Sequence, residues 1–329
     1  MDRRILFAFI MSLAVPYGCS MALLGASLTK PGRLKEQETF PSVLSCDSPE
    51  KRSFRRIRLD LGNTQEKTVD LEVYLPLVVA GQIPAEAHPE AIKAQTILAR
   101  TYICRQMEQM GLEEEIPESA LGLEKDGNSQ MEKLWGTEIF PEYYSRFEKA
   151  ARETEGITLT WEGHFIDPLF THTTAGFTRP GDEAHPYLAF VSCVHDPEAE
   201  GFVQEIIMQP EEAAKRVSAI PAGDGAFRTI PPEAFPEQVQ IISRDEAGYA
   251  RQLQIGGYPF DGEEVRLALG LPSACFELDR QGSDVRFAVR GRGHGWGLSQ
   301  TEAQAMAEDG WSAEEILEYF YTGILFSSE

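Results

Sequence analysis

The spacing of apolar residues along the chain predicts short strands and helices in alternation. Apolar and polar residues alternate over 57–61 and 69–74, a pattern typical of half-buried strands. Pro89 then opens a segment that runs to about Met110, and proline is well tolerated at the first position of a helix. Apolar residues recur there at steps of three and four: Ala91, Ala94, Leu98 and Tyr102. This stripe predicts a helix with one buried face.

The rest of the chain continues the mixed pattern. It predicts a helix over 147–153, strands over 157–161 and 164–171, a short helix after Pro210 and several short β segments over 239–290. The chain closes with two helices, each opened by a serine with a glutamate three residues later, as in a capping box: Ser299 with Glu302, and Ser312 with Glu315. The fold class is therefore α+β, with short strands and helices around one catalytic-type cleft.

Three segments between these elements are predicted to be irregular. Residues 112–128 are acidic and contain several glycines, which indicates an exposed insertion. Residues 180–186 are expected to form a loop, and the proline-rich stretch over 220–236 is expected to be another insertion or a junction between subdomains. A subdomain insertion is accordingly placed at about 200–260.

The N-terminal segment predicts a position at the cell membrane. Arg3 and Arg4 precede an uncharged run over 5–24, which is about the length that crosses a bilayer as a helix. We expect a signal anchor over 1–28, a stalk over 29–55, and one domain over 56–329. The protein would be a single-pass membrane protein with most of its chain outside the cytoplasm.

Two alternatives remain for this segment. Ser20-Met21-Ala22 offers a weak cleavage site for a secretory signal peptide. A lipoprotein signal ending at Cys19 is poorly supported by the residues before that cysteine. Both alternatives also place the rest of the chain outside the cytoplasm.

The charge of the chain argues against one class of partner. The formal net charge is −22 and the pI is about 4.7, which argues against nucleic acid because phosphate binding requires patches of Lys and Arg. A glycan or a charged protein is compatible with this charge.

The cysteines leave two possibilities open. An extracytoplasmic location permits disulfides among Cys46, Cys104, Cys193 and Cys275 in three complete pairings, and buried thiols are the alternative.

One group of residues raises the question of a metal. His172, His185, Cys193 and His195 lie close together in sequence, and His with Cys suits zinc. Their spacing matches no standard zinc pattern. We therefore predict no cofactor, with zinc left as an alternative.

Three motifs, in order along the chain, resemble the stage II sporulation protein D family. The resemblance covers about 57–326 and also extends to the related domain of amidase enhancers. The motifs are Leu71–Tyr74 with Val78–Pro84 and Glu90–Tyr102, then Ala150–Trp161 with Phe170, Thr173–Thr178 and Pro186–Leu188, and finally Gly291–Gln300 with residues 305–321.

The resemblance implies an enzyme of the bacterial cell wall. Family members are lytic transglycosylases that cleave glycan strands already stripped of stem peptides, leaving 1,6-anhydro ends. They act during engulfment of the forespore, beside a partner amidase and a membrane scaffold. Amidase enhancers are instead associated with binding and activation.

The chain departs from the family at the catalytic position. The family's catalytic glutamate stands just before an Ile/Met-Pro pair, and this chain has Gln82 there. An amide cannot supply a proton near neutral pH, although it can donate and accept hydrogen bonds. Glu86 is a candidate substitute for the lost acid, whereas Glu90 resembles an ordinary family residue in the first turn of the helix. Two hypotheses follow: a transglycosylase with a relocated acid, or a glycan-binding scaffold that assists an amidase.

Polar residues of all three motifs are candidates for binding glycan. Arg100 could instead brace a buried carboxylate, the threonines could cap locally, and His294 could belong to a tight structural turn. We expect Gln82, Arg100, Thr178 and His294 to converge on one cleft. The candidates are Lys93, Gln95, Arg100, Thr174, Gly176, Thr178, Arg292, His294 and Gln300.

Overall fold

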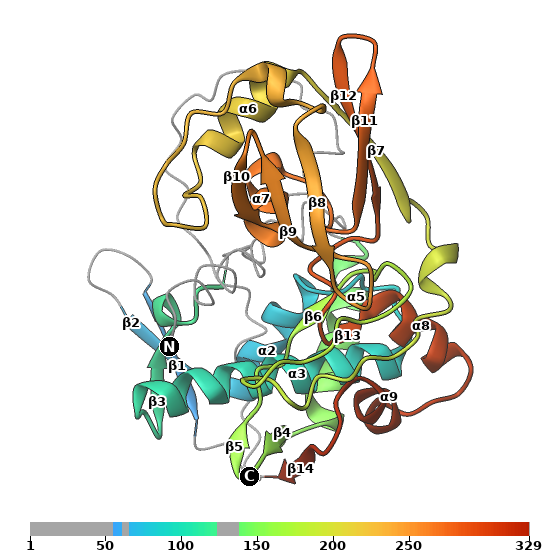
Figure 1. Cartoon of the computed structure of the whole chain (residues 1–329). Coiled ribbons are helices and arrows are strands. Elements are labelled where there is room, and N and C mark those ends of the chain that lie inside the picture. The colour runs from blue at the N-terminus through green and yellow to red at the C-terminus, as the bar shows by residue number, and fades with distance from the viewer. Residues whose placement is uncertain (1–54, 61–65, 124–137, 329) are drawn as a thin grey trace. The chain divides into compact units, whose positions relative to one another are not determined.

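A computed structural model describes residues 55–60, 66–123 and 138–328 (Figure 1). In these ranges the chain forms seven α-helices and fourteen short strands that build several small sheets. The mixed α+β class predicted from the sequence is confirmed. The chain divides into two compact units, which are described separately below. The predicted single domain over 56–329, with an insertion near 200–260, stays a prediction.

The first unit contains the described residues up to Pro168 together with 312–314 and 324–328. One sheet has the order β2-β1-β3 and another the order β14-β4-β5. Their strands are β1 (Arg56–Asp60), β2 (Glu66–Asp70), β3 (Glu115–Pro117), β4 (Ile157–Trp161), β5 (His164–Phe165) and β14 (Leu325–Ser328). The helices are α2 (Leu71–Ala80), α3 (Pro89–Met110), α5 (Phe140–Glu153) and the 3₁₀ turn η2 (Glu118–Ala120).

The second unit contains residues 169–311 and 315–323. Its sheets have the orders β10-β9-β8, β11-β12-β7 and β13-β6. The strands are β6 (Phe170–Thr171), β7 (Val203–Met208), β8 (Val239–Arg244), β9 (Ala250–Ile255), β10 (Tyr258–Asp261), β11 (Phe276–Gln281), β12 (Asp284–Arg290) and β13 (Leu298–Ser299). The helices are α6 (Pro210–Ser218), α7 (Gly262–Leu269), α8 (Gln300–Glu308) and the 3₁₀ turns η3 (Asp196–Glu198) and η4 (Pro232–Ala234). Helix α9 (Ala313–Phe320) contributes residues to both units.

The hydrophobic core of the second unit lies between its two larger sheets and the helices α6 and α7. Phe276 of β11 packs edge-on against Phe287 of β12, with ring centroids 5.9 Å apart. Val265 of α7 and Val217 of α6 are buried in the same cluster. Burial of these side chains orders the sheets from which the loops discussed below emerge.

Helix α3 has the bounds predicted from the sequence. His88 accepts a hydrogen bond from the Glu90 amide at the start, and Gly111 ends the helix in the left-handed conformation. The strand predicted over 69–74 is wrong, because β2 ends at Asp70. The Asp70 carboxylate accepts from the Glu72 amide and so caps helix α2, which takes up the following apolar residues.

The predicted membrane localisation is corrected by the structure. In the ranges that the structure describes, no helix combines the length and the apolar character needed to cross a membrane. The signal anchor expected over 1–28 and the stalk expected over 29–55, except for residue 55, lie outside these ranges.

A buried ion pair joins the helices of the first unit. The Arg100 guanidinium on α3 is 1 % exposed, and it binds both carboxylate oxygens of Glu72 on α2, at 2.7 Å each. Its remaining N–H groups reach the Ile157 carbonyl at the start of β4, the Ala151 carbonyl of α5 and the Thr154 hydroxyl just after α5. One side chain therefore fixes α2, α3, α5 and β4 relative to one another.

Arg100→Ala should lower the free energy of unfolding by about 3 kcal/mol, because it removes the partner of the Glu72 carboxylate, whose side chain is only 13 % exposed. Urea unfolding followed by circular dichroism would measure the loss. The matched control is Lys149→Ala, which removes an exposed ion pair with Glu153 and should cost less than about 1 kcal/mol.

A second comparison separates charge from packing. The double variant Glu72→Leu/Arg100→Met should lose less stability than Arg100→Ala, because no uncompensated charge stays buried. If Arg100→Ala lowers the free energy of unfolding no more than Lys149→Ala does, the Arg100–Glu72 pair does not hold these elements together.

Candidate functional site

Gln82 lies in the turn that follows helix α2. The Gly81 and Gln82 amides donate to carbonyls of the last helical turn, which fixes the backbone at this point. The Gln82 side-chain oxygen accepts a hydrogen bond of 2.8 Å from the side-chain Nε2 of Gln95, a fully buried residue of α3. The structure thus brings together two of the predicted site residues and holds the Gln82 amide in one orientation.

Glu86 lies on the loop between α2 and α3. Arg146 of α5 donates to the carbonyl oxygens of Ala85 and Ala87, at 2.5 and 3.0 Å, and so ties down the backbone on both sides of Glu86. The Glu86 side chain is exposed, and its hydrogen bond with the Tyr143 hydroxyl raises the pKa of that phenol. A proton donor for glycoside cleavage needs a site that desolvates it, and an exposed position offers Glu86 none.

Lys93 faces a small hollow beside α3 and α5. Its ammonium group pairs with Glu90 and lies 3.6 Å from Glu153. Burial alone would raise the pKa of Glu90, but the bonds from Lys93 and from the Ala313 amide bring that pKa below its ordinary value. The hollow has a volume of about 130 Å³ and is lined by Pro89, Ile92, Lys93, Arg146, Lys149, Ala150 and Glu153.

Arg100 is held by Glu72, as described above, and of the two roles predicted for it the structure shows the bracing of a buried carboxylate. Its guanidinium is enclosed by protein. A sugar could reach it only if these internal bonds broke.

In the second unit, Thr174 binds a buried carboxylate. The Thr174 amide and hydroxyl donate to Asp196 at 2.6 and 2.5 Å, and the Ser299 hydroxyl donates to the same group at 2.8 Å. Asp196 is completely buried, and burial raises its pKa to about 6 although these hydrogen bonds act in the opposite direction. The sequence pattern does not single out Asp196, because an isolated Asp-Pro pair is typical of a turn.

Thr178 also points inward. Its hydroxyl donates to the Ala189 carbonyl at 2.6 Å and accepts from the Val191 amide at 2.8 Å. Gly176 accepts a hydrogen bond from the Cys193 amide through its carbonyl. Of the two roles predicted for these hydroxyls, the structure shows the local one.

The glycine-rich loop after β12 is a tightly packed turn. Gly293 has φ +115°, and a Cβ atom there would lie 2.0 Å from the Thr171 hydroxyl. The His294 ring is buried, accepts a hydrogen bond from the Trp296 amide and also bonds to the Phe170 backbone. Burial, assisted by Arg266 and Arg179, lowers the pKa of His294 to about 3, so the imidazole is neutral.

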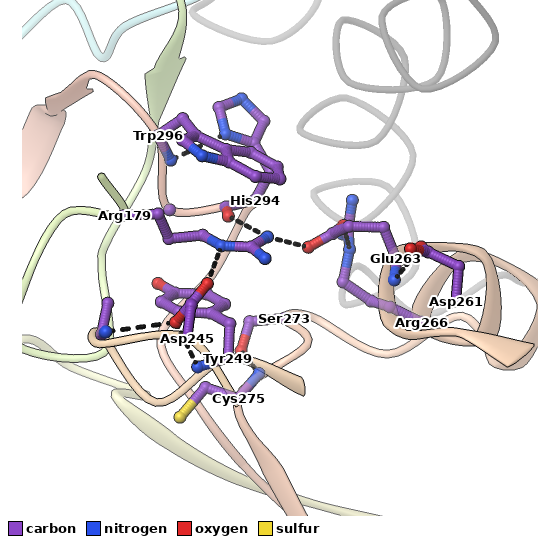
Figure 2. A network of polar contacts seen from close by, with 12 residues as sticks. Arg179, Asp245, Tyr249, Asp261, Glu263, Arg266, Ser273, Cys275, His294 and Trp296 are labelled. Carbon is purple, nitrogen blue, oxygen red and sulfur yellow. Dashed lines mark hydrogen bonds and ion pairs between the residues drawn. The ribbon is translucent and has the colours of Figure 1, made fainter. Parts of the chain in front are cut away.

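A network around Arg179 supports this loop (Figure 2). Arg179 is buried and pairs with Asp245 at 2.5 Å and with Glu263 at 2.7 Å. Its guanidinium lies 3.7 Å from the centre of the Trp296 ring, and it donates to the His294 carbonyl. No motif in the sequence singles out Arg179, because its partners come from distant parts of the sequence.

The remaining candidates also lie in the second unit. The Arg292 backbone forms a bridge with Thr173, and its charge helps burial to lower the pKa of His172 to about 4. Gln300 is buried at the first position of α8. The predicted convergence of Gln82 and Arg100 with Thr178 and His294 joins residues of different units and stays a prediction.

The structure also bears on metals and disulfides. In the described ranges, no three His, Cys, Asp or Glu side chains are arranged to hold a metal ion. His185 and His195 pair with different carboxylates, Asp182 and Glu302. Cys193 and Cys275 are buried free thiols, and Cys104 is buried with its sulfur accepting a hydrogen bond from Arg55. Cys19 and Cys46 lie outside the described residues.

Comparisons with known proteins confirm the resemblance drawn from the motifs. A family model described as stage II sporulation protein matches residues 61–161, which include Gln82, Gln95 and Arg100. The chain is 29 % identical over 271 residues to stage II sporulation protein D of Bacillus amyloliquefaciens, covering 80 % of this chain and 75 % of that protein. It is also 29 % identical over 277 residues to the protein of that name in Bacillus subtilis (strain 168), covering 80 % and 76 %.

A third relative has a different name. An amidase enhancer of Bacillus subtilis (strain 168) is 24 % identical over 299 residues, which cover 76 % of this chain and 40 % of that protein.

Gly293→Ala should destabilise the second unit by about 3 kcal/mol, because the left-handed conformation and the contact with Thr171 both exclude a Cβ atom. Differential scanning calorimetry would show this as a lower Tm. Gly282→Ala is the control: that glycine has φ +64° with no atom within 4 Å, so only the conformational cost of about 1 kcal/mol remains. Equal effects of the two variants would contradict the packing argument.

Asp196 should make stability fall as the pH rises. Its folded pKa of about 6 exceeds the ordinary value of 3.8, so the native state binds the proton more tightly. Its contribution should be full below about pH 4, decrease by about 3 kcal/mol up to about pH 6, and stay constant above that. The measurement is the free energy of unfolding of wild type minus that of Asp196→Asn from pH 4 to 7. A difference that stays constant or grows would refute the raised pKa.

Proposed function

We propose that this chain is a sporulation cell-wall protein that binds peptidoglycan glycan strands and presents them to a partner amidase, with little or no cleavage of its own. The observation that carries the proposal is Gln82, an amide at the position where the stage II sporulation protein D family has its catalytic glutamate. Its oxygen is bonded to the buried Gln95.

The chemistry of cleavage explains the weight given to Gln82. A lytic transglycosylase needs a carboxyl that protonates the glycosidic oxygen and then accepts the proton of the sugar's own 6-hydroxyl. Loss of general acid catalysis costs about 10²–10⁴-fold in rate. An amide has about the size of a protonated carboxyl and, like it, offers a donor group and an acceptor oxygen, so binding of a sugar can survive where proton transfer does not.

A role beside an amidase is supported by the relatives. Two of them are named stage II sporulation protein D, and one is named amidase enhancer. An enhancer needs to bind the glycan or the amidase but needs no acid of its own. The departure at Gln82 is compatible with that role, and the strongly acidic chain disfavours nucleic acid as a ligand.

The second candidate function is a transglycosylase that uses Glu86. The observation in its favour is that Arg146 and Tyr143 hold the loop and the side chain of Glu86 in place. The exposure of Glu86 counts against it, because a closed and desolvated site is needed to raise a carboxyl pKa.

Wild-type protein should bind glycan strands stripped of stem peptides and release few or no 1,6-anhydro ends from them. Pull-down with insoluble denuded glycan would measure binding, and mass spectrometry of the soluble fraction would measure cleavage. Gln82→Glu should restore cleavage where the surrounding residues still place the carboxyl, and Gln82→Ala is the matched control without a proton.

Each other outcome has a defined meaning. Cleavage by wild-type protein that Glu86→Gln abolishes would replace the proposal by the relocated acid. Cleavage that survives both Gln82→Ala and Glu86→Gln would place the active centre elsewhere. Failure of the wild-type protein to bind glycan at all would refute the proposed function.

A further inference from the structure

Two phenylalanines of the second unit are stacked on each other at the surface. Phe177 and Phe190 are 45 % and 42 % exposed, their ring centroids are 5.5 Å apart, and their planes differ by 18°. Neither residue belongs to the hydrophobic core. An exposed pair of parallel aromatic rings is a feature that folding alone does not explain.

The backbone beneath the pair is rigid. Phe177 forms an antiparallel bridge with Ser192, and the Thr178 amide donates to the Val191 carbonyl. The Thr178 hydroxyl, which is buried, bonds to Ala189 and Val191 from below. Residues 177–178 and 189–192 thus form a short two-stranded ribbon. Side chains alternate across such a ribbon, so the inward position of Thr178 leaves its neighbour Phe177 facing outward.

A third aromatic residue braces the ribbon. The Tyr319 hydroxyl donates to the Ser192 carbonyl at 2.6 Å, and the Ala189 amide donates to the Phe320 carbonyl of the same helix, α9. The backbone that carries the two rings is therefore fixed by hydrogen bonds before any ligand binds, which lowers the entropy cost of binding.

We propose that Phe177 and Phe190 form a stacking platform for the pyranose rings of a glycan chain. The apolar face of a pyranose ring matches a flat aromatic surface in size and polarity. This inference rests on the proposed glycan-binding function and adds to it a specific subsite.

The area of the platform favours a sugar over a protein partner. The two rings together expose on the order of 200 Å² of surface, since an aromatic side chain presents about 150–250 Å² when fully exposed. A stable protein interface buries about 800 Å² on each partner. Nucleic-acid bases also stack on aromatic rings, but the net charge of −22 would repel their phosphates.

The test measures the affinity of the full chain for a defined probe, a hexamer of β-1,4-linked N-acetylglucosamine, by isothermal titration calorimetry. Phe177→Ala and Phe190→Ala should each weaken binding about 3- to 10-fold. Phe177→Trp should preserve or strengthen binding. Phe227→Ala is the matched control, because Phe227 is 68 % exposed elsewhere in the same unit, and it should leave the affinity unchanged.

Phe177→Leu distinguishes stacking from general hydrophobic contact. Leucine keeps an apolar side chain but offers no ring face, so it should lose binding almost as alanine does. Full binding by Phe177→Leu, or unchanged binding by both alanine variants, overturns the platform. The circular dichroism spectrum and the Tm of each variant should equal those of the wild type, because both side chains project from the surface.

The outcomes separate this inference from the function on which it rests. Wild-type protein that binds neither the hexamer nor denuded glycan would refute the proposed function. Wild-type protein that binds glycan with no contribution from either phenylalanine would refute the platform alone. Concentration-dependent dimerisation that Phe177→Ala abolishes, measured by light scattering, would instead assign the surface to a second copy of the chain.

Discussion

The geometry around Gln82 depends on one buried charge, the guanidinium of Arg100. Taking an arginine out of water is costly, and the cost is offset only where each N–H group finds an acceptor. Here the acceptors come from α2, α5 and β4. Such a pair is weak evidence for stability in itself, but it is strong evidence for position, because the guanidinium fork accepts few arrangements. Helix α2 ends just before Gln82 and α3 carries Gln95. The ion pair that fixes these two helices therefore also fixes the hydrogen bond between the side chains of Gln82 and Gln95.

The second unit encloses a second arginine for a similar purpose. Arg179 is surrounded by two carboxylates and two aromatic rings, and it holds the carbonyl of His294 in the glycine-rich loop (Figure 2). The alternating glycines allow that loop to pass against Thr171 and Tyr249 at distances that no side chain would permit. The motif that looks most like a ligand-binding loop in the sequence is thus also a closely packed structural element.

The sequence predicted local structure well where capping and periodicity agree. Helix α3 has its predicted bounds because Pro89 and Gly111 mark its ends, and Ser299 caps α8 as its spacing with Glu302 indicated. The strand expected over 69–74 was wrong because alternation there also fits the first turn of α2, and the Asp70 cap decides between them. The α7 helix was not separated from the β segments around it.

The candidate site was predictable in part, for a physical reason. A motif reveals which residue types recur, as with Gln82 and His294, but it does not reveal the direction in which a side chain points. Thr174 and Thr178 proved to face inward, toward Asp196 and Ala189. Buried partners such as Arg179 depend on contacts far apart in sequence, and periodicity carries no information about them.

In the ribbon that carries Phe177, selection for folding and selection for binding act on different faces. Its inner face, with Thr178 and Ala189, is committed to the protein interior, whereas its outer face bears rings that contribute little to the core. Substitutions on the outer face can therefore accumulate without a penalty in folding, while the same backbone keeps them in register. A lineage could change what it recognises at this surface, or lose that recognition, while its fold and its abundance in the cell stayed the same.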